Sequence, residues 1–190
     1  MVEKLRSNWK RMLKWVGIAL IYVVPLVAVQ AAFDMFLKID GVPGESADAK
    51  HKGEIDVLSW SWGASNPVVG RGVGGGGAGK VAFQDLTITK YIDKASPALY
   101  LACCQGNHYN TATLTVRKTG LNQQEYLVYK LSDIIISSVA PAGAQSDAKQ
   151  AEKITFNFGK IRWTYTPQKA DGSSDTPVQG GWDVISNVKQ

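Results

Sequence analysis

A glycine-rich segment, GGGGAGK over residues 74–80, carries most of the G-x-x-x-x-G-K pattern with which nucleotide-binding proteins hold phosphate. In such proteins a Ser or Thr follows the lysine and binds Mg²⁺, and the loop leads into a helix whose N-terminus faces the phosphate. In this chain Val81 follows Lys80, and the next residues alternate as a strand does. We therefore interpret the segment as a connector and predict no nucleotide site.

Two carboxylates, Glu54 and Asp56, are two residues apart, so a strand places both on one face. The spacing is similar to the start of the strand motif of jelly-roll β-glucanases, in which a third acidic residue follows. Leu58 and Ser59 stand where that residue is needed. Because retaining glycoside hydrolysis requires two carboxyl groups about 5–5.5 Å apart in defined roles, we interpret the pair as a solvated or ion-paired strand face.

Thiols and imidazoles are few in this chain. Cys103 and Cys104 are adjacent, which would strain a disulfide between them, and we expect both to be small buried groups. Redox activity and palmitoylation are the alternatives. We predict that His51 and His108 are solvated turn residues. Because no Cys/His spacing suits zinc and no Ser/His/Asp set can be assembled, we expect no metal, no cofactor and no enzymatic activity.

The first 31 residues have the layout of an export leader. Five cations precede Trp15, an apolar stretch extends to Val29, and small residues occupy the third and last positions before a cleavage site between Ala31 and Ala32. The apolar stretch of about 15 residues is short for a membrane span, which needs about 20, and Pro25 interrupts it. A retained membrane anchor and a misassigned start are the alternatives.

Charge is unevenly distributed along the chain. The formal net charge is +5, and residues 1–31 hold five basic residues against one acidic residue. The remaining body therefore holds 16 basic and 15 acidic residues. A nearly neutral body lacks the basic surface with which proteins bind phosphate backbones, so we expect no nucleic-acid partner. The length predicts a single domain, residues 32–190, after the leader.

Alternating apolar and polar residues, separated by turn residues, predict a mainly β domain of the sandwich or barrel type. Within the sixth segment the apolar parity changes between Phe158 and Ile161, and we expect a bulge at Gly159 to restore one apolar face. The predicted strands are Phe33–Ile39, Glu54–Trp62, Val81–Ile92, Thr111–Lys118, Tyr126–Val139, Ile154–Thr166 and Trp182–Val188.

One short helix interrupts the strands. Ser96 is a suitable N-cap, Pro97 suits the first helical position, and Gly106 can end the helix. We expect this helix to cover an open end or a flank of the β domain, because it is too short to be stable alone.

Seven stretches of the body, in order, match one protein family. They are FDMFLKIDGVPGES (33–46), KGEIDVLSWSWGAS (52–65), GAGKVAFQDLTITKYIDKASPALYLAC (77–103), ATLTVRKTG (112–120), YKLSDIIISS (129–138), ITFNFGKIRWTYTPQ (154–168) and GWDV (181–184). Through these stretches the sequence resembles the haemolysin-coregulated protein (Hcp) family, the tube subunit of type VI secretion. The resemblance spans nearly all of residues 33–184.

The resemblance implies two packed antiparallel sheets forming a β-barrel or sandwich, with one short α-helix. It also implies hexameric rings that stack into a hollow tube, with spike and effector proteins as partners and small effectors in the lumen. The family supplies no catalytic residue. Its extended loop, which reaches a neighbouring subunit, matches the stretch from Ala64 to Lys80. The implied contact residues are Ala64, Ser65, Asn66, Gly70, Arg71, Gly74, Gly75, Gly76, Gly77, Gly79 and Lys80.

The leader departs from the family pattern, in which members begin near the equivalent of Phe33 and load from the cytoplasm. With the leader, the expected location is secreted or periplasmic, and contact with a membrane occurs only if the leader is retained. If the start lies downstream, the protein is cytoplasmic before secretion.

The alternative function is a secreted effector or a carbohydrate-binding module built on the same β-fold. Trp60, Trp62, Trp163 and Trp182 would then form a sugar-binding platform. The competing interpretation of these tryptophans is packing in the core and between subunits.

Overall fold

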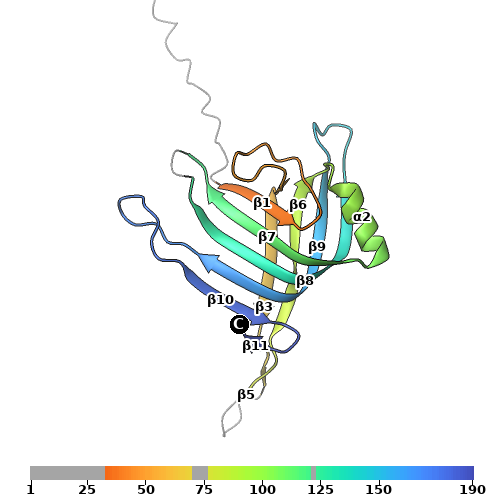
Figure 1. Cartoon of the computed structure of the whole chain (residues 1–190). Coiled ribbons are helices and arrows are strands. Elements are labelled where there is room, and N and C mark those ends of the chain that lie inside the picture. The colour runs from red at the N-terminus through yellow and green to blue at the C-terminus, as the bar shows by residue number, and fades with distance from the viewer. Residues whose placement is uncertain (1–32, 70–76, 121–122) are drawn as a thin grey trace, which may run out of the picture. The chain divides into compact units, whose positions relative to one another are not determined.

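A computed structural model describes residues 33–69, 77–120 and 123–190 (Figure 1). In these ranges the chain is built almost entirely of strands, with one helix, α2 (Ser96–Gln105). The strands are β1 (Phe33–Ile39), β2 (Ile55–Asp56), β3 (Ser59–Ser65), β4 (Val68–Val69), β5 (Gly77–Ala78), β6 (Ala82–Tyr91), β7 (His108–Lys118), β8 (Glu125–Ala142), β9 (Ala151–Tyr165), β10 (Val178–Asp183) and β11 (Val188–Lys189).

Antiparallel pairing joins most of the strands into one sheet that divides at β9. The main order is β11-β10-β9-β8-β7-β1-β2, while β6 pairs with β9 and β3 with β6. Along the edge of β9 that faces away from β8, β6 pairs with residues 151–156 and β10 with residues 160–165. The chain therefore forms two layers that share β8 and β9. This confirms the mainly β, antiparallel fold with one short helix.

The two layers form a sandwich and not a closed barrel. Among the described residues β2 pairs only with β1 and β3 only with β6, so both strands are at edges. The chain passes from β2 to β3 through Val57 and Leu58, where the predicted strand Glu54–Trp62 is interrupted. The predicted last strand is likewise divided into β10 and β11, which pair as a hairpin.

The change of parity in β9 is a bend that β8 shares. On β8 the buried residues change from Tyr129 and Leu131 to Ile134 and Ile136, and on β9 from Phe156 and Phe158 to Ile161. A continuous sheet that turns from one layer to the other must present its opposite faces to the core in its two halves. Because the buried face changes at the same level on β8 and β9, the two strands bend together from one layer into the other.

The predicted bulge at Gly159 is wrong. The pairs Ser132–Lys160 and Ile134–Phe158 keep the same register on both sides of Gly159. The described β8–β9 ladder shifts instead between Ile136 and Ser138. No inserted residue is needed at Gly159, because its partner strand bends at the same level.

The helix α2 is capped differently from the prediction. The N-cap is Ala95, and the Oγ of Ser96 accepts hydrogen bonds from the Asp93 N–H (3.0 Å) and from the Lys90 ammonium (3.1 Å). The C-terminal end is as predicted, since Gly106 has a φ of 66° and its N–H bonds to the Ala102 carbonyl. The helix lies beside β8 (Figure 1).

The cysteines of α2 are less buried than expected. Leu99 and Ala102 face the core, whereas Cys103 is half-buried and Cys104 is exposed. The prediction that Cys104 is a buried apolar group is therefore wrong. Leu99 and Ala102 occupy the face of the helix that packs on the core, and Cys104 lies on a different, exposed face.

A buried ion pair connects α2 to both β6 and β9. Lys90 and Glu152 face each other across the strands, with fully buried side chains, and Lys90 Nζ lies 2.8 Å from Glu152 Oε1. Ser96 and Tyr100 on α2 each donate a hydroxyl hydrogen bond to Glu152. Burial raises the pKa of Glu152, but these hydrogen bonds and the Lys90 charge outweigh it, so the pKa is lowered. Burial and Glu152 raise the pKa of Tyr100 to about 12.

We predict that Lys90→Met lowers the free energy of unfolding by about 3–5 kcal/mol, because it leaves the buried Glu152 carboxylate without its cation. Urea unfolding followed by tryptophan fluorescence measures the change. Replacing both partners, Lys90→Met with Glu152→Leu, should recover much of the loss. The control is Lys153→Gln, an exposed neighbour on β9, expected to stay within about 0.5 kcal/mol. A single Lys90→Met as stable as that control would contradict the assignment.

Candidate assembly surface

The segment from Ala64 to Lys80 begins as the paired end of β3. Ala64 and Ser65 lie opposite Phe83 and Ala82 of β6. The chain then forms a second two-stranded ladder, β4 with β5, which continues beyond the ends of β3 and β6 (Figure 1). Sequence reasoning missed these two strands, because elements of two residues carry no periodicity.

A close backbone approach fixes the base of this hairpin. The Gly79 N–H donates to the Pro67 carbonyl at 3.2 Å, and a Cβ at Gly79 would lie only 2.8 Å from that oxygen. Asn66 and Lys80 are exposed beside it. After Lys80 the chain enters β6 and not a helix. This agrees with the prediction that residues 74–80 are a connector and not a phosphate-binding loop. Of the implied contact residues, those outside the described residues are Gly70, Arg71, Gly74, Gly75 and Gly76.

An open sheet edge leads into the hairpin. Among the described residues β3 pairs on one side only, with β6, so the backbone groups on its other side take part in no ladder. Unpaired strand edges are sites at which a further strand or chain can add. Ser59 and Ser61 on this strand are exposed, while Trp60 and Trp62 point to the core.

Large apolar side chains are exposed at several strand ends and turns and on helix α2. The most exposed are Ile185 (71%) and Val178 (64%). The others are Phe33, Leu58, Tyr91, Ile92, Leu101, Tyr165 and Val188. Apolar surface of this kind is what subunit interfaces bury.

The tryptophans of the proposed sugar platform pack against the core. Trp62 lies 5.6 Å from the Tyr129 ring and 6.0 Å from the Trp163 ring, centroid to centroid. Trp60 meets Tyr129 edge-on at 4.9 Å, and Trp182 is also half-buried against the core. All four tryptophans are partly buried and packed against the core, which agrees with the packing interpretation.

The segment between β1 and β2 is held by a buried guanidinium. Arg117 on β7 is 2% exposed and donates to Asp48 at 2.6 and 3.0 Å and to Asp34 at 2.8 Å. Its hydrogen bonds hold the pKa of Asp48 well below the ordinary range, and Asp48 in turn raises the pKa of Arg117. The guanidinium also lies 4.9 Å from the centre of the Phe36 ring.

His51 belongs to the same group, contrary to the prediction that it is solvated. It is 6% exposed, stacks on Phe36 with ring centres 4.1 Å apart, and its Nδ1 lies 2.9 Å from Glu54 Oε2. Glu54 is therefore hydrogen-bonded or ion-paired and Asp56 is exposed, as predicted, but Glu54 lies in a bend before β2, so the two carboxylates do not share a strand face. His108 is exposed, as expected, but it is the first residue of β7 and not a turn residue.

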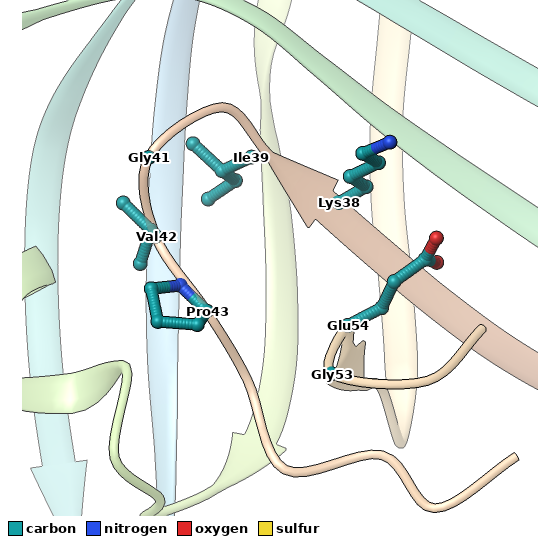
Figure 2. Close-up of a pocket in the computed structure, with 7 residues that line it drawn as sticks. All are labelled: Lys38, Ile39, Gly41, Val42, Pro43, Gly53 and Glu54. Carbon is teal, nitrogen blue, oxygen red and sulfur yellow. The ribbon is translucent and has the colours of Figure 1, made fainter.

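An open hollow of about 280 Å³ lies next to this segment (Figure 2). In Figure 2 Lys38 of β1 and Glu54 extend to the same side of β1, and Val42 and Pro43 lie on the turn that follows. The lining residues are Lys38, Ile39, Gly41, Val42, Pro43, Gly53 and Glu54. They include no Ser, Thr, Cys or His side chain, and within the described ranges no three His, Cys, Asp or Glu residues are placed to hold a metal ion.

The described helix, α2, is not long and apolar enough to cross a bilayer.

The sequence of the chain is similar to those of known proteins. Residues 36–165 match the family model described as "Type VI secretion system effector, Hcp". The chain belongs to the Hcp family. Protein hcp1 of Pseudomonas aeruginosa is 50% identical over 160 residues, which cover 83% of this chain and 99% of that protein. The Hcp resemblance inferred from the sequence is thus confirmed.

Solved Hcp structures share the fold. A chain described as a type six secretion system protein superposes with a TM-score of 0.80 at 34% identity, covering 84% of this chain and all of that one. Hcp1 from Salmonella typhimurium gives a TM-score of 0.69 at 36% identity, over 84% of this chain and 100% of its own. A "Major exported protein" of Pseudomonas aeruginosa is 29% identical over 114 residues, 54% of this chain and 65% of that protein. This Hcp chain is therefore a type VI secretion protein by family.

Proposed function

We propose that this Hcp protein is a self-associating structural subunit, whose copies close into hexameric rings that stack into a hollow tube and carry small effectors in the lumen. The observation that carries the proposal is the β4–β5 hairpin, which continues from β3 and β6 beyond the sandwich. The match to Protein hcp1, which is 50% identical and covers 99% of that protein's length, supports it. In this role the protein acts without catalysis, and its further partners are spike and effector proteins of the secretion machine.

The surfaces of the sandwich suit head-to-tail association. The hairpin and the open edge of β3 belong to the β6 branch of the sheet, whereas the exposed Val178 and Ile185 lie on β10 and in the turn that follows it. When one surface of a subunit binds a different surface of the next, the contacts close into a ring if the rotation allows it. Glycine loses more conformational entropy than other residues when its backbone is fixed, so a contact made through the glycine-rich residues 63–79 is weaker than its area suggests and stays reversible.

We propose that residues 1–31 are an export leader removed between Ala31 and Ala32, giving a secreted or periplasmic domain of residues 32–190. The order of cations, apolar stretch and small residues motivates this proposal. The intact mass of the chain recovered from a bacterium with working secretion should begin at Ala32. A product that starts at Met1, with no shorter form, would contradict it.

A second candidate is a secreted effector that uses the Hcp fold without forming a tube. The family description, which names an effector, favours it. The packed tryptophans do not favour a sugar-binding version of this function. Association separates the two candidates, because an effector of this kind needs no ring.

We predict that deleting Gly72–Ala78 leaves the β domain folded and weakens ring formation or stacking. The deletion removes β5 and much of the arm, the segment Ala64–Lys80 that we propose contacts a neighbour. Light scattering at matched concentrations measures the loss of mass, and circular dichroism checks the fold. The length-matched control, Gly74→Ser with Gly76→Ser, keeps the arm and should associate like the parent. Equal masses for the deletion variant and the parent would remove the arm from the assembly mechanism.

A further inference from the structure

Two cations face each other on the outer side of the β8–β9 ribbon. Lys130 and Arg162 are direct cross-strand partners, and both side chains are exposed. Like charges at directly opposite positions destabilise a sheet. Among the described residues no carboxylate lies within 4.0 Å of either group, whereas the nearby Lys160 has Asp183 at 3.8 Å and Asp133 at 4.0 Å. The sheet therefore carries an uncompensated positive pair at this point.

A polar hollow of about 170 Å³ is lined in part by this pair. Its lining residues are Lys130, Ser132, Lys160, Ile161, Arg162 and Gln190. Gly181 is the partner of Arg162 on β10, and a Cβ there would lie 3.3 Å from Gln190 Cβ and 3.6 Å from Arg162 Cγ. The missing side chain at Gly181 lets Gln190 pack across β10, where the Gln190 N–H bonds to the Gly181 carbonyl at 3.1 Å. The C-terminal residue thus forms one wall of the hollow.

We propose that this hollow binds an oxyanion group, a phosphate or a carboxylate, between Lys130 and Arg162. The guanidinium of Arg162 offers two parallel N–H donors to two oxygens, and the Lys130 ammonium adds a second charge. The Ser132 hydroxyl and the Gln190 amide are further donors on the wall. Binding removes the repulsion between the two cations, so it stabilises the fold as well as the complex. This function does not depend on ring assembly.

The charge around the hollow favours a small oxyanion over a long polyanion. Outside residues 1–31 the chain has 16 basic and 15 acidic residues, so it is nearly neutral, and the neighbouring Lys160 lies beside the carboxylates of Asp133 and Asp183. A nucleic acid needs many phosphate contacts along an extended basic track. One phosphate, or one acidic side chain of a partner, needs only the two facing cations.

The test is thermal unfolding of the full chain, with chloride replaced by inorganic phosphate or by glutarate at constant ionic strength. Filling the site should raise Tm by about 2–4 °C in a saturable way. Lys130→Gln and Arg162→Gln should lose most of this shift, while their Tm in chloride equals or exceeds that of the parent, since the repulsion is gone. Arg162→Lys keeps the charge but not the fork and should retain part of the shift.

Lys153→Gln removes an exposed cation on the same strand, outside the hollow, and should respond like the parent. General stabilisation by phosphate acts on every variant alike, so equal shifts in the parent and in both hollow variants would overturn the proposal. A response to phosphate alone assigns a phosphate group as the ligand, and a response to glutarate alone assigns a carboxylate such as an acidic side chain. No saturable response to either anion would also overturn it.

Discussion

The bend shared by β8 and β9 at Asp133 and Gly159 is the constraint on which the two-layer architecture depends. A Cβ at Gly159 would lie 2.9 Å from Ile185 Cδ1 and 3.0 Å from Asp133 Cβ, so a side chain there would require Ile185 and Asp133 to shift. Both strands reverse their buried faces there. Residues 151–156 of β9 therefore pair with β6 in one layer, and residues 160–165 pair with β10 in the other. The β6 branch holds β3 and the hairpin, and the β10 branch holds the wall of the oxyanion hollow. Both candidate surfaces thus follow from one bend.

Two buried cations then fix the segments that hydrophobic packing leaves undetermined. Lys90 ties α2 to β6 and β9 through Glu152, and Arg117 ties the β1–β2 segment to β7 through Asp48 and Asp34. Each cation is compensated by carboxylates, as burial of a charge requires. Lys130 and Arg162 are the contrast, since they are exposed, face each other and have no carboxylate partner among the described residues. That difference separates a structural cation from a candidate for ligand binding.

Local alternation was sufficient to locate the longer strands, and β1 has the predicted bounds, Phe33–Ile39. What failed depended on contacts between segments distant in sequence. Ser96 looked like an N-cap until its hydroxyl was placed beside Lys90 and Glu152, and His51 looked solvated until Phe36 was placed beneath it. The parity change in β9 was visible, but its cause required the register of β8. The arm was found through family resemblance, whereas the facing pair Lys130 and Arg162 could not be found without the ladder.

The central claim is that this Hcp chain associates with itself into closed rings. Electron micrographs of the purified protein, with its native mass measured on the same sample at high micromolar concentration, test that claim most directly. The account predicts ring-shaped particles with an open centre and a mass of six copies. A strictly monomeric mass with no ring-shaped particles would contradict it and favour the secreted effector.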